Sequence, residues 1–353
     1  MWPRSDLLDL LGIVQPIVQA PMSGFATPAL AAAVANAGGL GSLGCVGVPL
    51  ARVREQVAAL RQATNQPFNL NFFVHAEPVP DPVRAAAMRA ALAPFYAAYS
   101  AGPVPEPSVP LSSFSDDDLA LVLDLRPRVV SFHCGVPSVE RITRIKEAGC
   151  LVLSSATTVA EARALEAAGA DAIIAQGWEA GGHRGSFSDS AGAGLVGTMA
   201  LVPQVVDAVH VPVVAAGGIA DGRGIAAAFT LGASGVQLGT AFLACPEAAT
   251  PLPHRLRLHE ASDDGTVLTR IFTGRPARAL RNQLASTVDD QMALDFPMQI
   301  SLLAPLRQAA GEAAQVDFAP FWAGQAAPLA RPLPAAELVE RLAAEAQALL
   351  PRS

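Results

Sequence analysis

The sequence has few charged residues, few aromatic residues and few cysteines. Charged residues make up 16% of its 353 residues and aromatic residues 5%, whereas hydrophobic residues make up 51%. A disordered chain needs the opposite balance, so this composition indicates a folded protein with a large apolar core. The net charge is −7, and no cluster of Lys and Arg occurs. We therefore expect no nucleic-acid partner, because nucleic acid is bound by a concentrated positive surface.

Long uninterrupted hydrophobic runs are also missing. Residues 10–51 and residues 224–246 contain no charged residue, but glycines break both stretches. Neither contains the roughly 20 consecutive apolar residues that span a bilayer. We therefore expect no membrane segment, and we interpret both stretches as buried strands that alternate with Ala-rich helices.

Paired cysteines and a secretory signal are absent as well. The four cysteines are scattered, without the short spacing typical of zinc ligands, so we expect no metal site. The first residues lack the layout of a signal peptide. Both observations favour a reducing, cytoplasmic location.

Eight short apolar runs recur along residues 1–250, separated by helical patterns. Most are apolar throughout, as expected for parallel strands that are buried on both faces. Alternating strands and helices predict a parallel sheet, and eight such units favour closure into a (β/α)8 barrel, the TIM barrel. An open doubly wound sheet is the alternative, but no GxGxxG motif follows an early strand. The predicted strands are Ile17–Ala20, Leu40–Leu43, Phe68–Phe72, Val129–Phe132, Leu151–Ser154, Ala172–Ala175, Val213–Ala216 and Val236–Leu238.

Two segments interrupt this alternation. Residues 75–113 contain eight prolines and one helical pattern near Pro82–Ser100, so we expect an insertion over the barrel mouth. Residues 251–320 predict a smaller helical lobe that covers the C-terminal face of the barrel and contacts the substrate. In the final segment, 321–353, an amphipathic helix over Pro334–Leu350 is expected to pack back against the barrel.

Glycines follow the last two predicted strands. Ligands of such barrels bind at the C-terminal ends of the strands. Gly217-Gly218 follow the seventh run and Gly239-Thr240 the eighth, each directly before a helix. Backbone N–H groups exposed in this way bind phosphate, and barrels of this class hold phosphate at this position. Either pair alone would also suit a tight turn, but together they predict a phosphate-bearing ligand.

Polar groups at other strand ends suit a flat polar ligand. Asn71 and Gln176 offer amide donors and acceptors, which would match a flavin, a sugar or a nucleobase. Met22 follows Pro21 and would offer an apolar surface beside a flat ring, although packing in the core is nearly as plausible for it. These residues do not choose among ligands by themselves.

His183 is the strongest candidate for a catalytic group. It lies in a Gly-rich loop after the sixth predicted strand, with Trp178 nearby to exclude water. An imidazole in this setting can accept or donate a proton near neutral pH. Glu179 is the second candidate for an acid–base group, and His133 is a possible pocket residue.

These motifs resemble those of the nitronate monooxygenase family, formerly called 2-nitropropane dioxygenases. The most specific is the run 176–183, Gln-Gly-Trp-Glu-Ala-Gly-Gly-His. Further similarity lies at residues 19–22, 69–71, 216–219, 237–240, 273–278 and 322–325. The resemblance covers most of the chain, from Gln19 to about Gln325.

The resemblance implies non-covalent FMN, with its phosphate at Gly218 and at Gly239-Thr240. We expect His183 to face the flavin where the nitro group of the substrate lies. A nitronate would be oxidised by the flavin and oxygen to a carbonyl compound and nitrite. With a neutral nitroalkane, His183 would remove the α-proton. With a nitronate anion, His183 would hold the substrate in place. The expected cofactor-binding residues are Ala20, Pro21, Met22, Asn71, Gln176, Gly181, Gly217, Gly218, Gln237, Leu238, Gly239 and Thr240.

The chain also departs from the best-known bacterial members, which place several tyrosines and a lysine around the substrate. Its only tyrosines are Tyr96 and Tyr99, and the later segment offers Gln299, Leu303 and Arg307 instead. A different or more apolar nitronate would suit such a pocket.

Two other functions share the glycine motifs. One is an FMN-dependent enoyl-acyl carrier protein reductase that uses NAD(P)H, and the other is a flavin-binding barrel without turnover. A relative of inosine-monophosphate dehydrogenase fits less well, because no cysteine occurs between Cys150 and Cys245. A homodimer is compatible with each of these functions.

Overall fold

Eight parallel strands form the central sheet of the computed structural model, which describes residues 2–187 and 194–351. Their order around the sheet is β1-β9-β8-β6-β5-β4-β3-β2. Each of the eight predicted runs overlaps one of these strands, so the predicted barrel is confirmed. The strands are β1 (Ile17–Gln19), β2 (Gly41–Gly44), β3 (Phe68–Phe73), β4 (Val129–His133), β5 (Leu151–Ala156), β6 (Ala172–Gln176), β8 (Val213–Ala216) and β9 (Gly235–Leu238).

The sheet closes on itself between β1 and the start of β2. Val18 forms a parallel bridge with Leu40, the residue directly before β2. The Gln19 N–H donates to the Leu40 carbonyl at 2.9 Å, and the Leu40 N–H donates to the Ile17 carbonyl at 2.9 Å. This closure rules out the open doubly wound sheet.

Side chains of neighbouring strand residues pack on opposite faces of the barrel wall. Ile173 packs outward in the layer shared with the helices, whereas Ile174 packs inward with Val18. Burial of each such side chain stabilises the fold by about 1.5–3 kcal/mol relative to exposure. The helix α1 (Asp6–Leu11) contributes Leu7 and Leu11 to the inner cluster.

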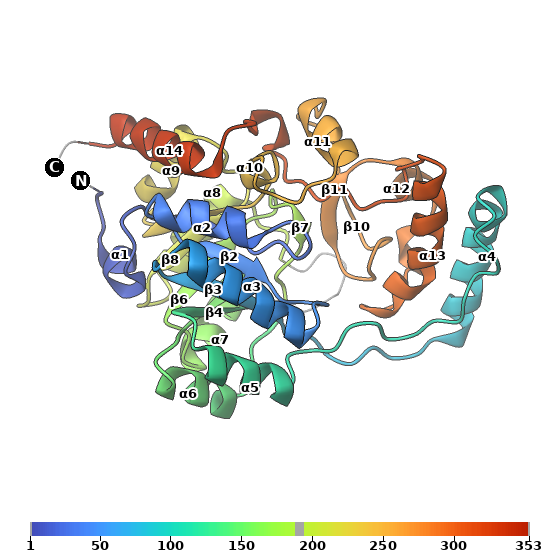
Figure 1. The fold of residues 1–353 in the computed structure, drawn as a ribbon, viewed down its shortest axis with the longest axis horizontal. Coiled ribbons are helices and arrows are strands. Elements are labelled where there is room, and N and C mark those ends of the chain that lie inside the picture. Colours follow the sequence, from blue (N-terminus) through green and yellow to red (C-terminus); the bar gives the residue numbers. More distant parts are fainter. Residues whose placement is uncertain (1, 188–193, 352–353) are drawn as a thin grey trace.

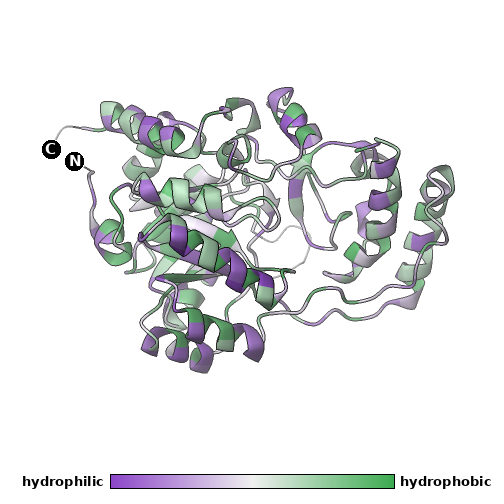
Figure 2. Cartoon of the chain, in the orientation of Figure 1, coloured by the Kyte–Doolittle hydropathy of each residue, from purple (hydrophilic) through white to green (hydrophobic). Residues whose placement is uncertain are grey.

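An outer ring of helices covers the barrel (Figure 1). Residues at the helix ends fix where each helix begins and stops. Thr158 and Glu161 form a capping box at the start of α7 (Val159–Ala167), and Gly169 follows this helix with φ +100°, where a side chain would be strained. Figure 2 shows that these helices carry hydrophilic and hydrophobic residues together. The helices are α2 (Pro28–Asn36), α3 (Leu50–Ala63), α5 (Asp116–Leu125), α6 (Val139–Glu147), α7 (Val159–Ala167), α8 (Thr198–Val206), α9 (Gly222–Thr230) and α10 (Thr240–Leu243).

The predicted insertion and the predicted lobe form one body. The insertion helix α4 (Pro82–Ala98) packs against α13 (Met298–Glu312), and both contribute to one hydrophobic cluster. The Tyr96 hydroxyl donates to the Leu302 carbonyl at 2.6 Å. Long extended segments connect α4 to the barrel (Figure 1). The lobe also contains α11 (Leu252–His259), α12 (Gln283–Thr287) and the 3-10 turn η1 (Asp290–Met292).

The lobe is helical in its larger part, as predicted, but it also contains a small antiparallel sheet that the sequence analysis missed. The strands β10 (Thr266–Thr269) and β11 (Ala277–Leu280) pair with each other, and β11 pairs with β7 (Gly182–His183). Arg278 interrupts the apolar pattern of β11, yet it is buried because its guanidinium donates to the Trp178 carbonyl at 3.0 Å. This sheet joins the lobe to the Gly-rich loop.

The last helix lies against the barrel. α14 (Ala335–Leu349), which follows the 3-10 turn η2 (Ala327–Leu329), packs on α9 and α2. Leu338 and Leu342 lie in the same hydrophobic cluster as Ile225 of α9. Within residues 2–187 and 194–351, none of the helices has the length and apolar character needed to cross a bilayer.

Candidate active site

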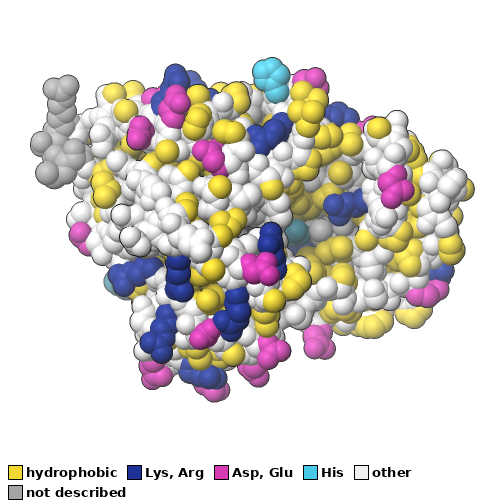
Figure 3. All heavy atoms as spheres, viewed as in Figure 1, with side chains coloured by type: hydrophobic (Ala, Val, Ile, Leu, Met, Phe, Trp, Pro, Cys, Tyr) yellow, Lys and Arg dark blue, Asp and Glu magenta, His cyan; other side chains and the backbone are white. Residues whose placement is uncertain are grey.

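A cavity of about 440 Å³ lies at the C-terminal ends of the barrel strands, between the barrel and the lobe. The space-filling view shows the surface hollowed between these two parts (Figure 3). The cavity wall contains His183 and all but one of the predicted cofactor residues: Ala20, Pro21, Met22, Asn71, Gln176, Gly181, Gly217, Gly218, Gln237, Gly239 and Thr240. The exception is Leu238, whose side chain is buried in the outer core and whose carbonyl accepts from the Ala20 N–H at 2.8 Å.

The two glycine turns meet at one end of the cavity. Gly217 and Gly218 have φ values of +104° and +73°, which only glycine adopts readily. Among the described residues, no acceptor pairs with the N–H groups of Gly217, Gly218 and Gly239. The Thr240 hydroxyl accepts from the Gly324 N–H at 2.9 Å, so its own hydrogen is left to donate. This donor set suits a phosphate.

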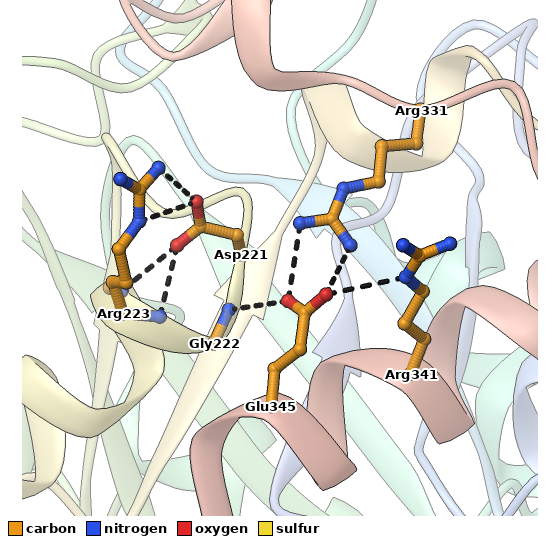
Figure 4. Close-up of polar contacts among 7 residues, drawn as sticks. Asp221, Gly222, Arg223, Arg331, Arg341 and Glu345 are labelled. Atoms are coloured by element: carbon orange, nitrogen blue, oxygen red, sulfur yellow. Dashed lines mark hydrogen bonds and ion pairs between the residues drawn. The ribbon is translucent and has the colours of Figure 1, made fainter. Parts of the chain in front are cut away.

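The start of α9, by contrast, is closed by protein carboxylates (Figure 4). Asp221 accepts from the Arg223 N–H at 2.9 Å, and Glu345 of α14 accepts from the Gly222 N–H at 3.2 Å. Arg331 forms a bidentate ion pair with Glu345, which fixes the position of that carboxylate. The first turn of α9 is therefore already occupied by protein carboxylates, whereas the glycine turns and Thr240 keep donors for a ligand.

Amide groups in the cavity wall have capacity left for a ligand. Gln237 Oε1 is buried and has no hydrogen-bond partner among the described residues. An unsatisfied buried acceptor costs about 1–3 kcal/mol, which a ligand donor would offset. Asn71 uses its amide hydrogens on Ser131, at 3.1 Å and 2.9 Å, so its oxygen remains available. The residues present therefore fit a flat, polar, phosphate-bearing cofactor such as FMN.

The ring of His183 is held between aromatic side chains and one hydroxyl. Its Nε2 lies 3.1 Å from Thr273 Oγ1. The ring centroid lies 5.5 Å from that of Phe73, 5.7 Å from that of Phe296 and 5.3 Å from that of Trp322. These neighbours come from the barrel, the lobe and the segment after the lobe, so the imidazole is positioned by three parts of the chain.

The backbone of His183 is held by hydrogen bonds as well. Its carbonyl accepts from Gln176 Nε2 at 3.0 Å and lies 3.0 Å from His133 Nε2. Gln176 also accepts from the Gly185 N–H at 2.7 Å. Gln176 thus holds the loop with one donor and one acceptor position and keeps one of each for a ligand.

The pKa values of both histidines are low. Burial, followed by the neighbouring His133 and Arg275, lowers the pKa of His183 to about 3. Burial is also the main cause that lowers the pKa of His133, to about 4. The positive charges of Arg275 and Arg184 lower this pKa further, whereas the hydrogen bond to the His183 carbonyl raises it. Both imidazoles are therefore neutral near pH 7, and the site offers a neutral proton acceptor or donor.

Glu179, the second candidate for the acid–base group, does not line the cavity. Its carboxylate accepts from the N–H and the hydroxyl of Thr198, both at 2.9 Å, at the start of α8. Its side chain lies behind Gly218, where an added Cβ would approach Glu179 Cβ to 3.2 Å. Glu179 therefore supports the glycine turn from outside the cavity.

Buried arginines hold the Gly-rich loop through its carbonyl groups. Arg184 donates to the carbonyls of Gln176 and Gly177, and Arg275 donates to those of Arg184 and Ser186. Arginine forms several such bonds at once because its guanidinium carries five donors in one plane. The loop that presents His183 is thus held at several carbonyl groups by two guanidinium groups, and it lies in a positive environment.

Sequence analysis missed several cavity residues. Phe73 and Phe296 lie beside His183 and were not singled out. Trp322 and Thr273, which also lie beside it, fell in the motif runs 322–325 and 273–278, to which no role was given.

Of the three residues that the sequence offered for the substrate pocket, Arg307 of α13 lines the cavity and forms no ion pair with the described residues, whereas Gln299 and Leu303 are buried elsewhere in the lobe. Burial lowers the pKa of Arg307, and its guanidinium places a positive charge at the cavity wall.

A closed barrel with a phosphate-type donor set and a histidine in one cavity defines an α/β-barrel enzyme. A family model described as nitronate monooxygenase matches residues 4–345. The nitronate monooxygenase of Pseudomonas aeruginosa is 46% identical over 345 residues, covering 95% of this chain and 97% of that protein. The nitronate monooxygenase of Paraburkholderia phytofirmans is 44% identical, covering 97% and 95%. The chain belongs to the nitronate monooxygenase family, and it is an oxidoreductase.

Solved structures agree with this assignment. The nitroalkane oxidase from Streptomyces ansochromogenes superimposes with a TM-score of 0.89 at 45% identity, covering 98% of each chain. FabK from Thermotoga maritima superimposes with a TM-score of 0.75 at 33% identity, covering 97% of this chain and 96% of that one. The greater similarity is to the nitroalkane oxidase. Family membership also implies a flavin as the redox group.

Proposed function

We propose that the protein binds FMN in the cavity and oxidises nitronates with oxygen, releasing a carbonyl compound and nitrite. The observation that carries this proposal is that both glycine turns and the His183 imidazole line one cavity. The phosphate of FMN would lie against Gly218, Gly239 and Thr240. Met22, Asn71, Gln176, Gly181 and Gln237 would contact the rest of the cofactor.

The redox chemistry would be that of bound FMN, and the protein positions the substrate and excludes water. Thr273 engages His183 Nε2, so Nδ1 is the ring nitrogen left for the substrate. With a neutral nitroalkane, the neutral imidazole accepts the α-proton at Nδ1. With a nitronate, the tautomer protonated at Nδ1 donates a hydrogen bond to a nitro oxygen. The negative charge of a bound nitronate favours the protonated imidazole, so it raises the pKa of His183 above the low value of the free site.

Two further groups suit an anionic substrate. Arg307 supplies a positive charge at the cavity wall, and the Phe296 and Trp322 rings next to His183 keep water away. Electrostatic attraction in a partly desolvated site exceeds that in water. The compartment we infer is the reducing cytoplasm, which suits four free, buried cysteines.

The decisive experiment mixes the purified yellow protein anaerobically with propionate 3-nitronate, ethylnitronate or NADH, each alone. Loss of the flavin absorbance with a nitronate, followed by nitrite release when oxygen is admitted, supports the proposal. Reduction by NADH alone would favour an enoyl reductase instead. Reduction by none of the three would favour a flavin-binding barrel without turnover, and a colourless protein that ignores added FMN would refute the cofactor.

A further inference from the structure

The side chain of Glu179 connects the Gly-rich loop to the start of α8. Its carboxylate accepts from the N–H and from the hydroxyl of Thr198, both at 2.9 Å. The Thr198 hydroxyl also lies 2.8 Å from the Gly217 carbonyl, which is a second acceptor for it. Because a hydroxyl carries a single hydrogen, Glu179 and Gly217 share the donor capacity of Thr198. Glu179 therefore acts on the first glycine turn through Thr198.

The contact with Thr198 orients the peptide group between Gly217 and Gly218. This peptide is trans, so its C=O and its N–H point in opposite directions. The Gly217 carbonyl points to Thr198, and the Gly218 N–H therefore points away from it. Gly217 and Gly218 line the cavity, whereas Glu179 and Thr198 do not. The contact thus leaves the Gly218 N–H, which no described residue accepts, to the cavity.

The main chain of Glu179 supports the other half of the predicted phosphate site. Its carbonyl accepts from the Gln325 N–H at 2.9 Å. Gly324 packs directly on this carbonyl, since an added Cβ at Gly324 would come within 2.8 Å of its oxygen. The Gly324 N–H in turn donates to the Thr240 hydroxyl at 2.9 Å. One residue thus contacts the supports of two of the donors, Gly218 and Thr240, that a phosphate would meet.

We propose that Glu179 is a positioning residue for the phosphate of the bound cofactor, and that its side chain acts through the hydrogen bond between Thr198 and the Gly217 carbonyl. This inference rests on the proposed FMN cofactor. It gives Glu179 a part in cofactor binding, in place of the acid–base role that its position four residues before His183 suggests.

The sign of the effect separates positioning from charge. A carboxylate behind a phosphate repels it, so loss of the charge alone would tighten the binding of FMN. Glu179→Ala removes the charge together with the contact to Thr198, and positioning requires weaker binding. Glu179→Gln removes the charge and keeps the contacts. Its amide oxygen accepts from the Thr198 N–H, and its amide nitrogen donates to the Thr198 hydroxyl, whose hydrogen is then free for Gly217.

The experiment measures the dissociation constants of FMN and of riboflavin for the full-length apoprotein, by quenching of flavin fluorescence. Riboflavin lacks the phosphate, so a defect confined to the phosphate site should not change its constant. In Glu179→Ala the constant for FMN should rise by about tenfold or more, as expected for a weakened hydrogen bond to a charged group, and that for riboflavin by less than about twofold. Glu179→Gln should bind FMN at least as tightly as the wild type.

Variants at two other positions complete the test. Thr198→Val keeps the N–H that Glu179 accepts but lacks the hydroxyl, so it should weaken FMN binding as Glu179→Ala does, and Thr198→Ser should restore it. Glu166→Ala is the matched control. Glu166 also accepts from two backbone N–H groups, those of His210 at 2.6 Å and Val211 at 3.2 Å, but at the opposite end of the barrel, before β8 begins. It should leave both constants unchanged.

Equal rises of both flavin constants in Glu179→Ala would overturn the inference, because they would reflect a general loss of structure. Weak FMN binding in Glu179→Gln would also overturn it, since the charge that faces the buried Arg184 and Arg278 would then be what matters. If Glu179→Ala does not fold, or riboflavin does not bind measurably, an unchanged FMN constant in Thr198→Val has the same consequence. Failure of the proposed cofactor looks different: the wild type would then bind FMN no more tightly than riboflavin.

Discussion

Thr273 Oγ1 and His183 Nε2 lie 3.1 Å apart although 90 residues separate them in the chain. His183 follows the sixth barrel strand, whereas Thr273 comes from the lobe, between β10 and β11. The two are brought together because β11 pairs with β7, with Ala277 opposite His183. The lobe therefore does more than cover the cavity: it fixes the orientation of the imidazole.

This contact predicts graded effects on turnover. His183→Asn should retain FMN but lower kcat with a nitronate at least tenfold, a loss of about 1.4 kcal/mol or more. Thr273→Val removes the hydrogen bond to the ring, together with two longer contacts of 3.4 Å to the Arg275 backbone. It should lower kcat about fivefold, as expected for a bond worth about 1 kcal/mol. Thr273→Ser keeps the hydroxyl and should restore most of the rate. If the wild type and the three variants have equal kcat per bound flavin, neither His183 nor Thr273 takes part in the mechanism.

The pH profile of turnover should lack a histidine inflection near neutrality. Because the pKa of His183 is lowered to about 3, the free enzyme holds a neutral imidazole throughout the neutral range. We expect kcat/KM for ethylnitronate to vary less than about twofold between about pH 6 and pH 8. An inflection near the ordinary imidazole pKa that disappears in His183→Asn would contradict this.

The parts of the site that the sequence predicts consist of residues close together in the chain, whereas the parts that it does not predict combine residues far apart in the chain. Gly217-Gly218 and Gly239-Thr240 were found because each lies directly after a strand whose apolar run is itself visible in the sequence. The aromatic cage of His183 was not found, because Phe73, Phe296 and Trp322 meet only through the packing of barrel and lobe. Residue type alone does not reveal such an encounter.

For two polar residues, the sequence predicts the region of the site but not the direction of the side chain. Glu179, within the Gly-rich run 176–183, is the second candidate for the acid–base group from the sequence, but its carboxylate accepts from Thr198 at the start of α8. Gln176 was expected to face a ligand, and it also ties down the His183 and Gly185 backbone. Proximity in sequence identified the right region, whereas the direction of each side chain depends on hydrogen bonds to distant backbone groups.

The Thr240 hydroxyl should contribute measurably to FMN affinity. Thr240→Val removes a donor aimed at the proposed phosphate site, and a hydrogen bond to a charged group is worth about 1.5–3 kcal/mol. The dissociation constant of FMN, measured by quenching of its fluorescence on adding the apoprotein, should rise at least tenfold. Thr240→Ser should bind FMN nearly as the wild type does. An unchanged FMN dissociation constant in Thr240→Val would show that the phosphate does not bind at Thr240.

Glu345 should act on FMN binding from outside the cavity. It accepts from the Gly222 N–H, four residues beyond Gly218, and Arg331 and Arg341 hold it in place (Figure 4). Glu345→Ala releases this end of the turn and should raise the FMN dissociation constant about threefold to tenfold. Glu345→Gln keeps the acceptor and should restore the affinity. Arg341→Ala, which removes one contact of 3.3 Å from a half-exposed side chain, is the matched control.

The stability of the protein should fall as the solution is acidified, and His254 should account for part of the fall. His254 is 1% exposed, and burial is the main cause that lowers its pKa to about 4. Its imidazole is therefore neutral in the folded protein, while the unfolded chain takes up a proton below pH about 6.5. The stabilisation is fully present above pH 6.5 and is lost as the pH falls through about 4.

Between pH 7 and pH 5 this residue should lower the free energy of unfolding by about 1–2 kcal/mol. His254→Gln cannot titrate in this range, and its amide can still donate to the Trp322 carbonyl, which lies 3.1 Å from the imidazole Nε2 in the wild type. Urea unfolding of this variant at both pH values should show a correspondingly smaller loss. His183→Asn, which removes another histidine with a lowered pKa, should flatten the dependence in the same direction. Parallel losses in wild type and His254→Gln would show that His254 is protonated equally in the folded and unfolded protein.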